Sequence, residues 1–220
     1  MIKLPDFHRP FEYENNFYLS CDPSRISKII SHYELFKMTL DVPGVIVECG
    51  VFKGASLARF AMFRDLLSNS SAKKIIGFDI FGKFPPTRYK DDQKFRSRFI
   101  KTSGQQGISE KQLRQVLEHK GTDKNVEFIK GNIVQTVPKY VKEHPQLKIS
   151  FLNMDTDVYE PALTILNHLY PRLSRGGVIL IDDYGVFPGE TKAVDEFFKD
   201  KKVRILKLPY SMTPCYILKD

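Results

Sequence analysis

The chain has 220 residues, of which 42% are hydrophobic and 27% are charged, and its formal net charge is +8. This length suits one α/β domain with a sizeable core, and the composition argues against disorder along the whole chain. No apolar run approaches the ~20 residues of a membrane span, and residues 1–7 lack the apolar core of a secretory signal. Three scattered cysteines exclude a disulfide framework or a zinc site and predict a cytoplasmic protein.

The positive charge is concentrated in one segment, residues 82–125. This segment holds eleven Lys and Arg residues against five Asp and Glu residues, so it accounts for +6 of the net +8. Three explanations are open: a cap that attracts a phosphorylated or nucleotide-linked sugar, a solvated face without a partner, or a nucleic-acid surface. Its four aromatic residues are few for stacking bases, which argues against nucleic acid.

Residues 1–42 form an N-terminal region that precedes the first predicted strand. The first 22 residues are rich in proline and aromatic residues and predict an irregular arm that packs on the body. Pro23 and Ser24 then open a helix that runs to about Leu40, with apolar residues at three-to-four spacing. The aromatic arm is also a candidate contact with a second copy of the chain, in a homo-oligomer.

Residues 43–220 alternate short apolar runs with helical segments. Five runs predict parallel strands buried on both faces, namely 45–49, 74–79, 126–131, 148–155 and 178–183. Helices are predicted at 55–67, 109–120, 134–142, 160–173 and 191–199, and the final runs 203–208 and 214–218 pair as an antiparallel hairpin. The alternation predicts a doubly wound, mostly parallel α/β sheet with helices on both faces.

Carboxylates stand at four of the five predicted strand ends. They are Glu48, Asp79, Asp155 and the pair Asp182 and Asp183. Ligands of open parallel sheets bind beyond the carboxyl ends of the strands, and carboxylates are seldom buried without a partner. Single aspartates often cap helices or start turns, but the set as a whole indicates a ligand site.

The loop after the first strand, Glu48–Ser56, indicates the kind of ligand. It has glycines at positions 50 and 54 but lacks the third glycine of dinucleotide-binding proteins. Its bulky residues 51–53 fit a pyrophosphate poorly and suit a ligand without phosphate. Asp79, at the end of the second strand, is placed where an acid binds ribose hydroxyls. A glycine turn and a distal acid predict a nucleoside-bearing cofactor, and S-adenosylmethionine satisfies both requirements.

Asp155, Asp182 and Asp183 end two strands that we expect to be neighbours. Three carboxylates so close together repel one another and raise one another's pKa values unless a cation or protons intervene. Oxygen ligands alone suit Mg²⁺ or another hard divalent ion, and zinc is disfavoured because these loops hold no His or Cys. The alternative is that the three aspartates cap turns and a helix.

Several motifs occur in the order found in one known family. They are Val47–Ser56, Gly77–Phe81, Asn153–Pro161, Ile181–Gly185 and Lys192–Phe197. Together they resemble the macrocin O-methyltransferase (TylF-like) family, which includes sugar and aminocoumarin O-methyltransferases of antibiotic pathways. The resemblance runs from about residue 43 to 198. The sequence departs from the family pattern after the second strand, where Gly82 and Lys83 stand in place of Glu and Gly. This loop leads into the basic segment.

The resemblance implies a class I methyltransferase fold with strand order 3-2-1-4-5-7-6, S-adenosylmethionine as cofactor and a Mg²⁺ ion. Carried over by position, Asp155, Asp182 and Asp183 would be the metal ligands. The expected cofactor-binding residues are Glu48, Gly50, Ser56, Asp79, Asn132 and Asp155.

The expected reaction is SN2 transfer of a methyl group to a hydroxyl of a sugar, a nucleotide-linked sugar or a similar small molecule. A metal ion would lower the pKa of the bound hydroxyl and orient it, and Asp155 could accept its proton. His168 is an alternative base, but its mid-helix position favours a structural or surface role. The rival hypothesis is a non-catalytic, Rossmann-like protein that binds an anionic partner such as nucleic acid through residues 82–125.

Overall fold

The computed structural model describes residues 1–220 and contains one seven-stranded sheet. The strands are β1 (Val45–Cys49), β2 (Ile75–Asp79), β3 (Val126–Lys130), β4 (Ile149–Met154), β5 (Leu173–Ile181), β6 (Leu206–Lys207) and β7 (Cys215–Leu218). Their order is β3-β2-β1-β4-β5-β7-β6. Strands β1 to β5 are parallel, whereas β7 pairs antiparallel with β5 and β6. The predicted fold class, strand order and terminal hairpin are confirmed.

The register of the central strands brings their carboxyl ends to one edge of the sheet. Cys49 at the end of β1 pairs with Phe78 of β2 and with Met154 of β4. Met154 in turn pairs with Ile181 of β5, so Asp155 and Asp182 leave the sheet from adjacent positions. These strands are almost wholly apolar because helices cover both faces of the sheet.

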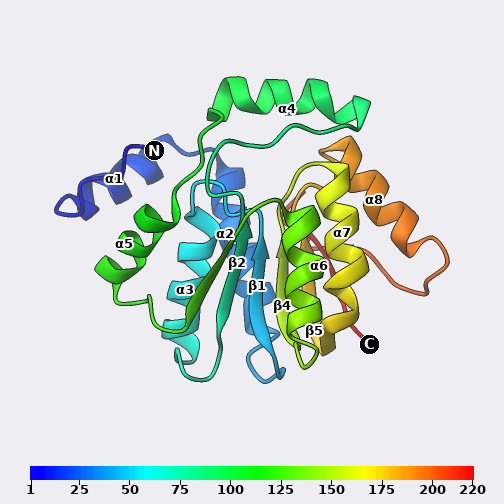
Figure 1. Cartoon of the computed structure of the whole chain (residues 1–220). Coiled ribbons are helices and arrows are strands. Elements are labelled where there is room, and N and C mark those ends of the chain that lie inside the picture. Colours follow the sequence, from blue (N-terminus) through cyan, green and yellow to red (C-terminus); the bar gives the residue numbers. More distant parts are fainter.

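Each face of the sheet has its own layer of helices (Figure 1). One layer consists of α2 (Pro23–Lys37), α3 (Ala55–Leu67) and α5 (Glu110–Lys120), and the other of α6 (Ile133–Glu143), α7 (Tyr159–His168) and α8 (Pro188–Phe198). Two clusters of 24 and 17 buried apolar residues fill the space between sheet and helices, one on each face. A short 3-10 turn, Tyr170–Arg172, follows α7. None of the helices combines the length and apolar character that crossing a membrane requires.

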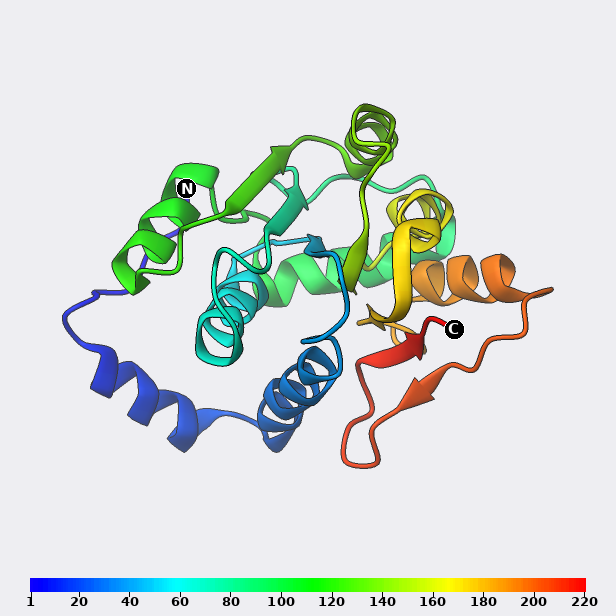
Figure 2. The same ribbon diagram turned by 90° about the horizontal axis from the view of Figure 1, so that it is seen from below.

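The N-terminal region differs from the expected irregular arm. Residues Pro10–Ser20 form a helix, α1, in which no side chain is buried. Figure 2 shows α1 between the first residues, which lie beside α5, and the start of α2. The first residues do pack on the body, since Phe7 stacks on His119 with 4.4 Å between ring centroids. The sequence pattern missed α1 because its apolar residues, such as Phe11 and Leu19, are exposed and form no core-facing stripe.

The basic segment contains a helix that the sequence pattern did not predict. Helix α4 (Lys90–Ser103) lies across the edge of the sheet where the strands end (Figure 1). Asp92 is fully buried and accepts hydrogen bonds from Tyr159 N at 2.9 Å and Gly189 N at 2.7 Å. These amides begin α7 and α8, where a carboxylate is favoured. Asp92 therefore ties α4 to the starts of α7 and α8, although most residues of α4 are charged or polar.

Candidate active site

A cavity of about 840 Å³ lies at the carboxyl ends of the strands, a size typical of small-molecule sites. The loops after β1, β3, β4 and β5 line it, together with Asp79 of β2 and parts of α2, α3 and the basic segment. The site residues expected from the sequence that lie on its wall are Gly50, Ser56, Asp79, Asn132, Asp155, Asp182 and Asp183. The structure brings together every expected site residue at the cavity wall except Glu48.

Gly50 allows the β1 loop to touch the end of β4. Its φ is +91°, and a Cβ atom added there would lie 1.7 Å from the carbonyl oxygen of Asp155. No side chain fits at that distance, so only glycine can stand at this position. The close approach places the loop backbone directly beside the first carboxylate of the β4 end.

Asp79 holds the β1 loop in its conformation. Its carboxylate accepts hydrogen bonds from Val51 N at 2.8 Å, Phe52 N at 3.0 Å and Phe81 N at 2.5 Å. Burial raises the pKa of Asp79, and these backbone donors oppose that effect. Since a carboxylate offers about four lone-pair sites, three bonds leave room for a further donor from the cavity.

Glu48 lies behind the cavity wall rather than on it. It is fully buried, and it accepts hydrogen bonds from the Ser56 hydroxyl and, at 3.2 Å, from Asn153 Nδ2. Its second oxygen, Oε2, has no partner. Burial raises the pKa of Glu48 to about 7. Glu48 therefore orients Ser56, which does line the cavity.

Exchanging Glu48 for Gln should remove part of the pH dependence of stability. Because the pKa of Glu48 rises from 4.5 to about 7 on folding, the folded state binds a proton between these values, and stability falls as the pH rises through that window. The shift corresponds to roughly 3 kcal/mol of unfolding free energy. Urea denaturation between pH 4.5 and 8 should show this loss in the wild type and a smaller loss in Glu48→Gln. Equal pH dependence in both proteins would contradict the assignment.

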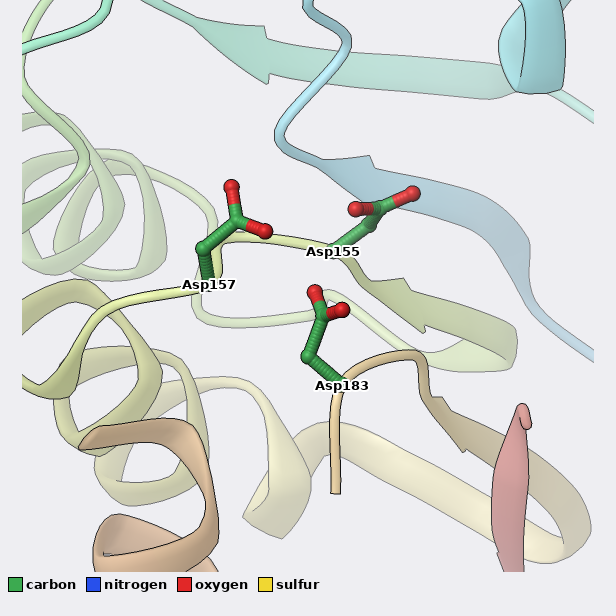
Figure 3. A group of neighbouring side chains, drawn as sticks. All are labelled: Asp155, Asp157 and Asp183. Carbon is green, nitrogen blue, oxygen red and sulfur yellow. The ribbon is translucent and has the colours of Figure 1, made fainter. Parts of the chain in front are cut away.

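Three carboxylates gather between the ends of β4 and β5 (Figure 3). Asp155, Asp157 and Asp183, which we call the acid group, each offer an oxygen, and these atoms lie within 4.8 Å of one another. Burial raises the pKa of all three carboxyls, and repulsion among neighbouring acids raises them further. Asp183 Oδ2 is buried without a hydrogen-bond partner. This oxygen-only donor set fits a hard divalent cation.

Asp182 lies outside this group of three acids and has its own cationic partner. Lys28 Nζ lies 2.5 Å from Asp182 Oδ2 and 3.9 Å from Asp155 Oδ2. Burial opposes ionisation of Asp182, but Lys28 and His32 together outweigh it and lower the pKa of that carboxyl. Neither Lys28 nor Asp157 was singled out in the sequence. A signal for Lys28 did exist, because Arg25, Lys28 and His32 recur at helical spacing and put polar groups on one side of α2.

Glu160 connects the basic segment, residues 82–125, to the end of β4 at the cavity. Its carboxylate accepts hydrogen bonds from Thr87 Oγ1 at 2.9 Å, Arg88 N at 2.7 Å and Tyr89 N at 3.2 Å. These residues lead into α4, so the segment Asp155–Glu160 supplies two of the three clustered carboxylates and also the acid that holds the loop before α4. His168 ends α7 and does not line the cavity.

Comparison with known proteins identifies the family. The model of the macrocin-O-methyltransferase (TylF) family matches residues 25–208. The demethyldecarbamoylnovobiocin O-methyltransferase of Streptomyces niveus is 29% identical over 163 residues, which make up 71% of this chain and 59% of that protein. The 8-demethyl-8-(2,3-dimethoxy-alpha-L-rhamnosyl)-tetracenomycin-C 4'-O-methyltransferase of Streptomyces olivaceus is 30% identical over 148 residues, 66% of this chain and 54% of that protein. The matches thus span less than two thirds of either curated relative.

Solved structures agree with this result. The crystal structure of CalS11, a calicheamicin methyltransferase, has a TM-score of 0.78 at 28% identity, and the match covers 96% of this chain and 86% of that one. The apo structure of CalS11, described as a TDP-rhamnose 3'-O-methyltransferase, has a TM-score of 0.70 at 26% identity, with 95% and 86% covered. Because the family match includes the β1 loop, Asp79 and the whole acid group, the chain belongs to the macrocin-O-methyltransferase (TylF) family of enzymes.

Proposed function

We propose that the protein is an S-adenosylmethionine-dependent O-methyltransferase that acts on a hydroxyl of a sugar or a nucleotide-linked sugar. The observation that carries this proposal is the cavity itself, which has the β1 loop and Asp79 on one wall and the acid group on another. Two similar proteins are named for rhamnose-bearing substrates, the tetracenomycin enzyme and CalS11. The family and the cavity support the same chemistry.

The cofactor is proposed to lie along the β1 loop. Asp79 would bind the ribose hydroxyls with its remaining acceptor capacity, and Asn132, which lines the cavity at the start of α6, would lie beside the adenine. Gly50 has no side chain, so the cofactor could approach the backbone of the β1 loop closely at this position. Ser56 and Asp155 stand where the amino-acid end would reach.

The metal proposal concerns the acid group. Asp155, Asp157 and Asp183 would hold Mg²⁺ or another hard divalent ion, and Asp182 would join them only on release from Lys28. When bound, such an ion lowers the pKa of an acceptor hydroxyl and orients it for in-line attack.

Asp155 is the proposed proton acceptor in the transfer step. The bound cofactor would supply the methyl group to the acceptor oxygen, and its sulfur would keep the electron pair of the broken carbon–sulfur bond as a neutral thioether. The hydroxyl proton passes to the Asp155 carboxylate, which lines the cavity.

Of the three explanations for the basic segment, its position favours a cap over the cavity that attracts a phosphorylated or nucleotide-linked sugar. Arg88 and Lys53 line the cavity, and Lys53 Nζ donates to Ser103 O at 2.6 Å, at the end of α4. Positive charge around a cavity raises the local concentration of an anionic acceptor such as a nucleotide-linked sugar.

Methyl transfer can be measured directly with methyl-labelled S-adenosylmethionine and a panel of nucleotide-linked and free sugars. We expect label in a sugar product, loss of transfer on chelation with EDTA, and recovery with Mg²⁺. Calorimetry with S-adenosylhomocysteine provides the control for cofactor binding. A protein that binds neither S-adenosylmethionine nor S-adenosylhomocysteine would refute the proposed function, and full activity in EDTA would refute the role of the metal.

A further inference from the structure

Two guanidinium groups on the α2–α3 side of the cavity have no acidic partner. Arg25, in the first turn of α2, and Arg59, in α3, both line the cavity. Neither takes part in any of the ten ion pairs of the chain. Arg25 is exposed and Arg59 is half-buried. Cations in a cavity wall without a counter-ion mark a place where an anion from outside the chain can bind.

A contact with His32 fixes the orientation of the Arg59 side chain. Its Nη1 lies 3.1 Å from Nδ1 of His32, a fully buried residue whose ring stacks on Phe60. Burial lowers the pKa of His32 to about 4, so the ring is neutral at physiological pH. Since a guanidinium can only donate, Nδ1 accepts and Nε2 carries the proton, facing Asp182 Oδ1 at 4.0 Å. His32 thus uses one donor of Arg59 and leaves the others free.

Several charged residues act on Arg59 through space, but no acidic residue contacts its guanidinium group. Burial lowers the pKa of Arg59, the neighbouring Arg25 lowers it further, and Glu48 opposes both. Asp155 and Asp182 also act on it through space, but they contact Lys28 instead. Two neighbouring positive charges repel each other, and a ligand that brings an anion between them relieves this repulsion.

A structural arginine in the same helix provides the contrast. Arg64 is fully buried and donates to Asp65 Oδ1 at 2.7 Å, Lys124 O at 2.8 Å and Thr122 O at 3.0 Å. Arg64 is thus satisfied by the fold, as buried charged groups are. Arg59 makes one hydrogen bond to the protein, so packing does not account for it.

We propose that Arg59 and Arg25 form an anion-binding subsite of the cavity, for a carboxylate or a phosphate group. Of these two sources the geometry favours the carboxylate at the amino-acid end of the cofactor, and in this form the inference rests on the proposed function. Arg59 lies three residues after Ser56 on α3, so the two side chains share one face of the helix. Asp155 stands on another part of the wall. A zwitterion would place its ammonium group by Asp155 and its carboxylate by Arg59 and Arg25, since the Ser56 hydroxyl already donates to Glu48.

Calorimetry with three ligands tests the subsite and identifies its anion. S-adenosylhomocysteine carries the carboxylate, 5'-methylthioadenosine keeps the nucleoside and thioether but lacks the amino-acid end, and thymidine diphosphate carries phosphates but no carboxylate. In Arg59→Met we expect S-adenosylhomocysteine to bind about ten- to hundred-fold more weakly and 5'-methylthioadenosine to bind as in the wild type. Arg25→Met should show a smaller loss in the same direction, and Arg59→Lys should recover part of the affinity.

The outcomes separate this inference from the proposed function. Arg175→Met, at an exposed position near the start of β5, is the matched control and should change nothing. If S-adenosylhomocysteine is unaffected but thymidine diphosphate loses tenfold or more in Arg59→Met, the subsite holds and its anion is a phosphate of the acceptor. If neither ligand is affected in Arg59→Met and Arg25→Met, the subsite is overturned. A wild type that binds neither S-adenosylhomocysteine nor S-adenosylmethionine refutes the proposed function itself.

Discussion

Asp155→Asn is expected to lower kcat for methyl transfer about 10³-fold, a typical loss when an acid–base group and a metal ligand are removed together. Asp155 belongs to the acid group with Asp157 and Asp183, lines the cavity, and lies 3.9 Å from Lys28. The amide keeps the shape of the side chain but loses the negative charge and the basic oxygen. Initial rates with labelled S-adenosylmethionine at saturating acceptor measure the effect.

The stability of the same variant distinguishes lost chemistry from lost fold. Burial and the charge of Asp182 raise the pKa of Asp155, so removing its charge should leave the melting temperature equal to or above that of the wild type. Asp200→Asn makes the same chemical change at an exposed residue after α8 and should retain full activity. An Asp155→Asn enzyme within tenfold of wild-type kcat would remove Asp155 from the mechanism.

Gly50→Ala is expected to destabilise the fold by at least about 4 kcal/mol, which is exceptional for the addition of one methyl group. The new Cβ atom would lie 1.7 Å from the carbonyl oxygen of Asp155. Both atoms sit at the ends of central strands, β1 and β4, which are tied by the bond from Asp155 N to Cys49 O at 3.0 Å. To relieve the clash, the β1 loop must move away from the end of β4. Urea denaturation, or loss of soluble protein on expression, detects this.

Gly121 offers a matched control for backbone strain without a clash. Its φ is +68°, in the same left-handed region, but a Cβ atom there would meet nothing within 4 Å. Gly121→Ala should therefore cost only about 1–2 kcal/mol, the penalty of the left-handed conformation itself. Similar losses in both variants would mean that the contact between the β1 loop and β4 is not tight.

The strands were predictable because each is a short apolar run bounded by turn residues. Helices with an apolar stripe, such as α5 and α7, were also found. Helices α1 and α4 were missed for a physical reason: α1 buries no side chain, and α4 has only a buried aspartate, Asp92, among its fully buried residues. The strand order came from the family resemblance, since composition and periodicity do not determine which strands pair.

The site was partly predictable because parallel strands end at one edge of the sheet. That rule located Asp79, Asp155 and Asp183 at the cavity without any knowledge of side-chain directions. It could not reveal that Lys28 pairs with Asp182, because these residues lie 154 positions apart and meet only when α2 packs on the sheet. Nor could it select Asp157, whose φ of +62° places its carboxylate beside Asp155.

A crystal structure with S-adenosylhomocysteine and Mn²⁺ bound tests most directly whether the acid group and the cofactor share this cavity. We expect the ribose hydroxyls on Asp79 and an anomalous Mn²⁺ peak bonded to Asp155, Asp157 and Asp183. A nucleoside bound outside the cavity, together with no Mn²⁺ peak among these carboxylates, would contradict the account.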